Sequence, residues 1–158
     1  MGSESMMSKK AEGTCPNPAQ FCLLFNCDSQ LATRICCHNR HYAEHAGYAF
    51  GKDITWTKEL LEKAQNPDLP QTTTYYDSIT GKSLFKAPVG RSIRELLVES
   101  EAHGWPSFRD QEVDWTNVRV LPNGEVISVD GTHLGHNLPD KNGNRYCINL
   151  VCIAGNER

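Results

Sequence analysis

The segment from residue 118 onward constrains the fold most, because runs of β-branched and apolar residues alternate there with turn residues. The runs 118–121 and 126–129 flank Asn123-Gly124, a pair typical of β-hairpins. The run 145–153 is apolar and β-branched enough to predict one well-buried strand. Together these runs predict a mainly β domain whose strands are antiparallel.

Two short helices are predicted before these strands. Residues 57–64 have a helical pattern that ends at a proline-containing stretch. Residues 92–103 begin with Ser92 and Glu95 at the spacing of a capping box, and Gly104 is placed to end the helix. The expected fold class is therefore mainly β with a few short peripheral helices.

The cysteines are distributed unevenly along the chain. Of the seven cysteines in 158 residues, five precede residue 38 and two follow residue 146. This number is too small for a disulfide scaffold in a chain of this length. We therefore expect a Cys/His-rich N-terminal extension over residues 1–50 and one compact domain over residues 51–158.

The net charge and the distribution of apolar residues argue against two classes of partner, nucleic acids and membranes. The net charge of −3 leaves no basic excess of the kind that nucleic-acid binding requires. No apolar stretch reaches the roughly 18 residues of a membrane span, and the N-terminal residues are polar rather than a secretory signal. We expect a cytoplasmic protein that binds neither nucleic acid nor membrane.

A cysteine in the last predicted strand is the first candidate for chemistry. Because side chains alternate along a strand, Arg145, Cys147 and Asn149 share one face. A neighbouring cation favours the thiolate, which is the reactive form of cysteine. The plainer interpretation is a buried cysteine that packs as a small apolar side chain, and this is the commoner outcome.

Two further motifs are ambiguous when taken alone. His133 and His136, followed by Asp140, could supply a proton, bind a metal or stabilise a loop. The sequence Gly-Trp-Pro-Ser-Phe, which contains Trp105 and Phe108, could form a rigid aromatic wall or fill the core.

In this order and at these separations, the three motifs resemble those of the MsrB-type methionine-R-sulfoxide reductases. The resemblance covers roughly residues 56–154. It implies a fold of two antiparallel sheets with peripheral helices, the MsrB/Mss4-like β fold. It also implies thiol chemistry without a cofactor, in which Cys147 attacks the sulfoxide sulfur, releases methionine and is left as a sulfenic acid.

The resemblance assigns roles to the neighbouring residues. Trp105 and Phe108 would bind the substrate, and Arg145 would support the thiolate. His133, His136 and Asp140 would bind and protonate the sulfoxide oxygen, while Asn149 would position the substrate or a water. The implied substrates are oxidised proteins or free methionine sulfoxide, and the implied reductant is thioredoxin or another thiol.

The chain departs from the family at two positions that matter for chemistry. Many members hold a zinc ion with four cysteines, and the matching positions lack them: Asp77, Thr80, Ile127 and Asp130. The position of the usual resolving cysteine is Ala102. Cys152 is not expected to replace it, because five residues of strand would place it about 16 Å from Cys147 on the opposite face.

The N-terminal cysteines therefore have three alternative roles. They could bind a structural zinc ion through Cys15, Cys22, Cys27 and Cys36. Alternatively, Cys36 or Cys37 could resolve the sulfenic acid as a disulfide. They could also be plain buried or solvated thiols. With zinc, the rival function is a non-catalytic, zinc-stabilised binding module on the same β scaffold.

Overall fold

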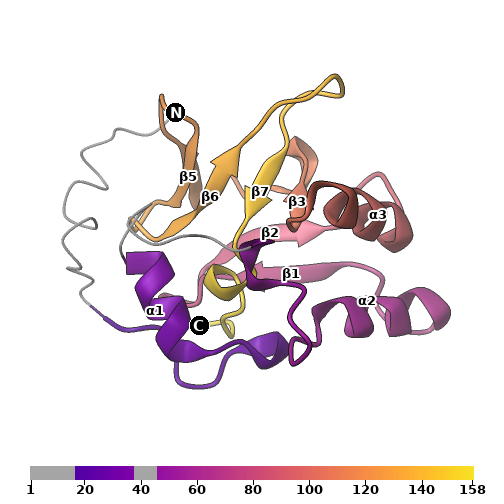
Figure 1. Cartoon of the computed structure of the whole chain (residues 1–158), viewed down its shortest axis with the longest axis horizontal. Coiled ribbons are helices and arrows are strands. Elements are labelled where there is room, and N and C mark those ends of the chain that lie inside the picture. Colours follow the sequence, from indigo (N-terminus) through magenta and orange to yellow (C-terminus); the bar gives the residue numbers. More distant parts are fainter. Residues whose placement is uncertain (1–16, 38–45) are drawn as a thin grey trace.

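The computed structural model describes residues 17–37 and 46–158. The elements follow the chain in this order: η3 (Leu24–Asn26), α1 (Ser29–Cys37), η4 (Ala46–Tyr48), α2 (Trp56–Gln65), β1 (Thr73–Tyr76), β2 (Ser83–Ala87), α3 (Ile93–His103), β3 (Ser107–Phe108), η5 (Asp110–Glu112), β4 (Val118–Val120), β5 (Glu125–Ser128), β6 (His133–Asn137), β7 (Tyr146–Ile148) and η6 (Leu150–Cys152). The predicted fold class is confirmed: the described chain is mainly β, with two antiparallel sheets and short helices (Figure 1).

The larger sheet has five strands in the order β3-β7-β6-β5-β4, and every neighbouring pair is antiparallel. The predicted hairpin joins β4 to β5, with Val120 opposite Val126. Gly124 lies in its turn at φ 92°, a backbone conformation that favours glycine. The sequence signal for this hairpin is therefore confirmed.

The smaller sheet pairs β1 with β2 in antiparallel register. Its strands were not identified from the residue pattern. The core faces of both strands are aromatic, because Tyr75 and Phe85 lie directly opposite each other and are fully buried. This sheet supplies a wall of the core behind the larger sheet.

Both predicted helices are present. At α3, Ser92 accepts a hydrogen bond from the backbone N–H of Glu95, and the Glu95 side chain accepts one from the N–H of Ser92. Gly104 ends the helix in the left-handed conformation at φ 76°. Within the described residues, every helix is too short or too polar to cross a bilayer.

The last strand is shorter than predicted. It ends at Ile148, and residues 150–152 form the 3-10 turn η6, closed by a hydrogen bond from the N–H of Cys152 to the carbonyl of Asn149. Because this turn is as apolar and buried as a core strand, hydrophobicity alone could not distinguish the two. The prediction that Cys147 and Cys152 lie on opposite faces of one strand is therefore wrong.

Residues 17–37 pack into the same hydrophobic core as the sheets. The apolar face of α1 contributes Ala32, Ile35 and Cys36, all of them buried. In Figure 1, α1 lies beside the C-terminal turn η6, with which it is in contact. The described residues on the two sides of the predicted boundary at residue 50 therefore share one core.

Candidate active site

A row of polar side chains crosses one face of the larger sheet. Cys147 in β7 is directly opposite Ser107 in β3 and His136 in β6, and His136 is in turn opposite Glu125 in β5. Directly opposed residues in an antiparallel pair project from the same face, with Cβ atoms about 5 Å apart. The register therefore brings the candidate nucleophile beside a histidine.

The thiol of Cys147 is almost fully buried, with an exposed fraction of 2%. The guanidinium Nη1 of Arg145, the residue directly before β7, donates a hydrogen bond to Cys147 Sγ at 2.7 Å. Burial raises the pKa of the Cys147 thiol, while the charge and hydrogen bond of Arg145, together with the Ser107 hydroxyl, act in the opposite direction. Arg145 therefore stabilises the thiolate in a site that otherwise disfavours it.

A β-bulge places the two histidines on one face. Residues three apart on a regular strand point to opposite faces. The pairing shifts so that Val126 faces Gly135 but Ile127 faces His133, which leaves Leu134 as an extra residue. The rings of His133 and His136 consequently lie 5.6 Å apart, centroid to centroid.

Gly135 allows β6 to approach β7 closely beside the nucleophile. A Cβ atom at this position would stand 1.9 Å from the carbonyl oxygen of Cys147. Any side chain there would push the strands apart, so the Gly between the histidines is a steric requirement of the site.

Glu125 is a site residue that the sequence analysis missed. Its Oε2 lies 2.7 Å from Nδ1 of His133, and both side chains are buried. A carboxylate at this nitrogen orients the ring and leaves Nε2 as the nitrogen directed elsewhere. The only sequence signal was an acidic residue directly before the predicted strand 126–129.

Asp140 is held by an arginine that the sequence analysis also missed. Nη1 and Nη2 of Arg109 donate to the two oxygens of Asp140 at 3.1 and 3.0 Å. Hydrogen bonds from Arg109 and from the backbone of Asn142 lower the pKa of Asp140 to about 2. Asp140 Oδ2 also lies 3.7 Å from Nε of Arg145, so the guanidinium that contacts Cys147 is paired with this carboxylate.

The ion pairs continue from Arg109 into the core. Glu99 on α3 accepts hydrogen bonds from Arg109 and, at 2.8 Å, from Arg91. Arg91 in turn pairs with the buried Glu112 at 2.7 Å. Charges of alternating sign therefore run from Glu112 to the Asp140 carboxylate. Each charged side chain in this row therefore has a neighbour of opposite sign.

Trp105 lies two residues before Ser107 and is half-buried. A Cβ atom on Gly47 would stand 3.1 Å from Cε3 of Trp105 and 2.7 Å from the carbonyl oxygen of Ile148. Gly47 also has a φ of 64°. The turn η4 therefore supports the indole from the N-terminal side, and only glycine fits at its centre.

Two residues assigned by the resemblance have structural contacts. Phe108 faces the core, where its ring stacks on Phe85 at 4.6 Å between centroids, and strand alternation directs it away from Cys147. The structure does not bring Phe108 to the candidate site, because its ring packs on Phe85 between the two sheets. Asn149 is fully buried and donates from Nδ2 to the carbonyl of Leu134 at 3.0 Å, which ties β7 to the bulge.

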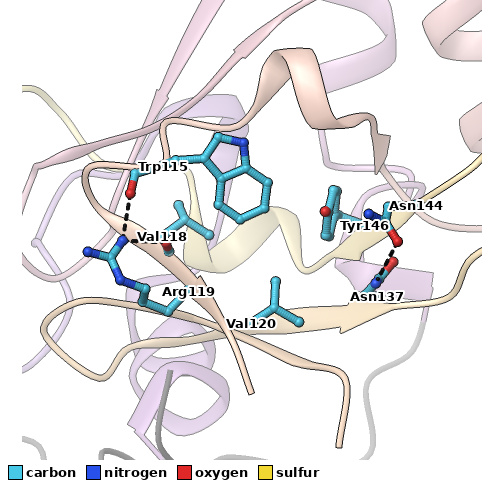
Figure 2. A pocket seen from close by; sticks show the side chains of 7 residues that line it. All are labelled: Trp115, Val118, Arg119, Val120, Asn137, Asn144 and Tyr146. Atoms are coloured by element: carbon cyan, nitrogen blue, oxygen red, sulfur yellow. Dashed lines mark hydrogen bonds between the residues drawn. The ribbon is translucent and has the colours of Figure 1, made fainter. Parts of the chain in front are cut away.

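A cavity of about 530 Å³ lies on the other face of the sheet (Figure 2). The half-exposed indole of Trp115 meets the ring of Tyr146 edge-on above β4, at 5.8 Å between centroids. Because Tyr146 and Cys147 are consecutive strand residues, their side chains point to opposite faces. This cavity therefore belongs to a different surface from the Cys147 row.

Cys36 and Cys37 lie in the hydrophobic core, and Cys147 is not part of that cluster. Cys36 Sγ lies 2.7 Å from Sγ of Cys152, in the core formed by the opposite face of the sheet. Cys37 is disulfide-bonded. The prediction of either as the partner of Cys147 gains no support from these positions.

The predicted zinc ligands do not converge where they are described. Cys15 lies outside the described residues. Cys22 is exposed, and burial followed by the proximity of Cys36 raises the pKa of Cys27 to about 12. Within residues 17–37 and 46–158, one group of potential metal ligands converges, and it has no cysteine: Glu99, His103 and Asp140. Arg109 already neutralises both of its carboxylates.

The positions of the family zinc site carry a polar network instead. The buried Asp77 accepts hydrogen bonds from the backbone of Ile79 and Thr80, and Lys82 pairs with Asp130 at 3.1 Å. The turn between β1 and β2 is thereby linked to the turn between β5 and β6. With no thiol at these positions, the residues do not fit a zinc ion.

Comparison with curated proteins supports the resemblance over part of the chain. The chain is 38% identical over 74 residues to the peptide methionine sulfoxide reductase MsrB of Pseudomonas fluorescens (strain Pf-5), and the match covers 37% of this chain and 57% of that protein. The chain thus spans little more than half of that relative. No family model and no solved structure matches the chain.

Proposed function

We propose that this chain is a peptide methionine-R-sulfoxide reductase with Cys147 as its nucleophile. The observation that carries the proposal is the arrangement around this thiol, which contacts the guanidinium of Arg145 and lies directly opposite His136. A thiolate beside a proton donor is what sulfoxide reduction requires. The partial similarity to an MsrB protein supports the same reaction.

The burial and location of the other site residues assign each of them a different role in the proposed reaction. His136 is partly exposed and adjacent to the thiol, so it protonates the sulfoxide oxygen. His133 is buried and paired with Glu125, so it positions His136 rather than meeting the solvent. Trp105 provides the apolar wall for the S-methyl group.

The reaction balances without a cofactor. The Cys147 thiolate attacks the sulfoxide sulfur, and the oxygen takes a proton from His136. Transfer of the hydroxyl group to Cys147 then releases methionine and leaves a sulfenic acid. A thiol condenses with the sulfenic acid to a disulfide and water, and a second thiol reduces that disulfide to restore Cys147.

We propose that the regenerating thiols come from an external reductant, thioredoxin or a small thiol. Ala102 on the exposed end of α3 has no thiol to offer. Cys36, one of the two sequence candidates, contacts Cys152 rather than Cys147. Oxidised proteins and free methionine sulfoxide are both proposed as substrates.

A stereospecific assay tests the proposal. The full chain is incubated with dithiothreitol and either the R or the S epimer of N-acetyl-methionine sulfoxide. We expect reduction of the R epimer alone, loss of activity in Cys147→Ser, and unchanged activity in Cys22→Ser, whose thiol is exposed and distant in sequence. A folded wild type that reduces neither epimer would favour the non-catalytic binding module.

A further inference from the structure

We propose that Cys36 and Cys152 form a disulfide bond that fastens the N-terminal helix α1 to the C-terminal turn η6. Neither residue has a role in the proposed reduction. The inference therefore goes beyond the proposed function and stands independently of it.

The distance between the two sulfurs carries the proposal. The Sγ atoms of Cys36 and Cys152 lie 2.7 Å apart in the core. A disulfide bond is about 2.05 Å long, so a sulfur movement of roughly 0.7 Å brings the two atoms to bonding distance. Two thiols this close are placed for covalent bonding rather than for apolar packing.

The surroundings favour a permanent bond over a chance contact. Both side chains have an exposed fraction of 0%. They are 116 residues apart in sequence and lie on elements that pack directly on each other, α1 and η6. The fold has therefore brought together two thiols from the two ends of the described chain and excluded water around them.

The neighbouring cysteine, Cys27, is a poor competitor for either sulfur in the folded chain. Burial, and then the proximity of Cys36, raises the pKa of Cys27 to about 12, so Cys27 remains a thiol. A protonated thiol is a poor nucleophile in thiol–disulfide exchange. After α1 has docked, exchange of the bond between Cys36 and Cys152 with Cys27 is therefore disfavoured.

The oxidant is a low-molecular-weight disulfide such as oxidised glutathione. One of the two cysteine thiolates attacks the disulfide and releases one glutathione thiol, which forms a mixed disulfide. The other cysteine then displaces the second glutathione thiol, so the chain loses two protons and two electrons while the small disulfide gains them. Because both sulfurs are buried in the folded chain, the exchange occurs before α1 has docked.

The bond would constrain the strand that carries the nucleophile. β7 ends at Ile148 and leads directly into η6, which contains Cys152. A link across 116 residues removes much of the freedom of the unfolded chain. It would therefore hold both α1 and the C-terminal end of β7 in place.

Peptide mapping tests the bond directly. Trypsin releases residues 35–40, which contain Cys36 and Cys37, and residues 146–158, which contain Cys147 and Cys152. The variant Cys37→Ala/Cys147→Ser leaves one cysteine in each peptide. After refolding with oxidised glutathione and alkylation in denaturant, we expect the two peptides to be linked, with the loss of two hydrogens, and to separate on reduction.

A matched variant and a melting curve complete the test. Adding Cys152→Ala should abolish the linked peptide and leave Cys36 fully alkylated. Reduction should lower the melting temperature of the two-site variant by several degrees but not that of the variant with Cys152→Ala. Complete alkylation of Cys36 and Cys152 after oxidation, or linkage of either to Cys27, would overturn the proposal. Because no sulfoxide is used, this result is independent of reductase activity.

Discussion

The guanidinium Nη1 of Arg145, the residue directly before β7, lies 2.7 Å from Sγ of Cys147. This contact opposes the effect of burial, which raises the pKa of the Cys147 thiol. The two residues are two positions apart in extended backbone, so their side chains project to the same side, and Asp140 Oδ2 lies 3.7 Å from Nε on the other side of the guanidinium.

Replacing Arg145 should therefore slow the reactions of Cys147. Burial already raises the pKa of this thiol, and Arg145→Met removes the charge that opposes the rise. At neutral pH we expect alkylation of Cys147 by iodoacetamide to slow by about tenfold or more, since one pKa unit is a factor of ten in thiolate. The rate is read by mass spectrometry of residues 146–158 as a function of pH.

Arg119→Met is the matched control for this experiment. Its guanidinium donates to the backbone carbonyls of Trp115 and Val118. Equal alkylation rates in Arg145→Met and wild type would show that the cation does not activate the thiol.

Arg109 is predicted to be a positioning residue for Asp140. Hydrogen bonds from Arg109 are the main reason that the pKa of Asp140 lies near about 2. In Arg109→Met that pKa should rise toward its ordinary value, so the acid limb of the pH–rate profile moves to higher pH. At neutral pH we expect kcat to fall by about tenfold, which is below the loss typical of removing an acid–base group.

Arg109→Lys should restore part of the acid limb, because it retains the charge but not the bidentate geometry. Arg94→Met, which removes an exposed arginine from α3, is the control and should leave the profile unchanged. An Arg109→Met enzyme with the wild-type pH profile would contradict the assignment.

Asp77 should make stability depend on pH in the direction opposite to most carboxylates. Burial raises the pKa of Asp77, so the folded state favours its protonated form. Such a group stabilises the fold below its unfolded pKa, and this contribution is lost as the pH rises through the folded pKa. Asp77→Asn should remove this loss, and the free energy of unfolding from urea titrations should then vary less above the unfolded pKa of about 4.

The exposed Asp68→Asn serves as the control for Asp77 and should retain the wild-type pH dependence. The same dependence in Asp77→Asn would show that this carboxyl is not responsible.

Gly47 should tolerate no side chain. Its φ of 64° is costly for other residues, and a Cβ atom would stand 2.7 Å from the carbonyl oxygen of Ile148. Gly47→Ala should cost at least about 1–2 kcal/mol in unfolding free energy from the backbone alone. Because the same Cβ would press on Trp105, KM for the sulfoxide should also rise.

Gly51→Ala provides the comparison, since its Cβ would meet only an ordinary contact at 3.7 Å. Equal melting temperatures for the two variants, measured by circular dichroism, would refute the steric argument.

Much of the fold could be predicted because its signals are local. The Asn123-Gly124 turn and the capping box of Ser92 with Glu95 depend on residues a few positions apart, and both are present. The end of β7 could not be predicted in this way. Whether the apolar residues after Ile148 continue the strand or turn depends on what covers them, and here α1 packs on the turn.

The sequence predicts the candidate residues of the site but not the contacts that hold them in place. Cys147 and Arg145 are two residues apart, and their contact follows from the local alternation of side chains. The pairing of His133 with Glu125 depends on a bulge at Leu134, and no local sequence pattern indicates this bulge. Arg109 reaches Asp140 across 31 residues of sequence, and such contacts require the tertiary fold.

A single-turnover experiment tests the central claim most directly. The full chain is reduced, freed of reductant and mixed with one equivalent of the R epimer in the presence of dimedone, which traps sulfenic acids. We predict one equivalent of methionine and a dimedone adduct on Cys147, with neither product from the S epimer. Methionine formation without modification of Cys147, or an adduct on another cysteine alone, would contradict the account.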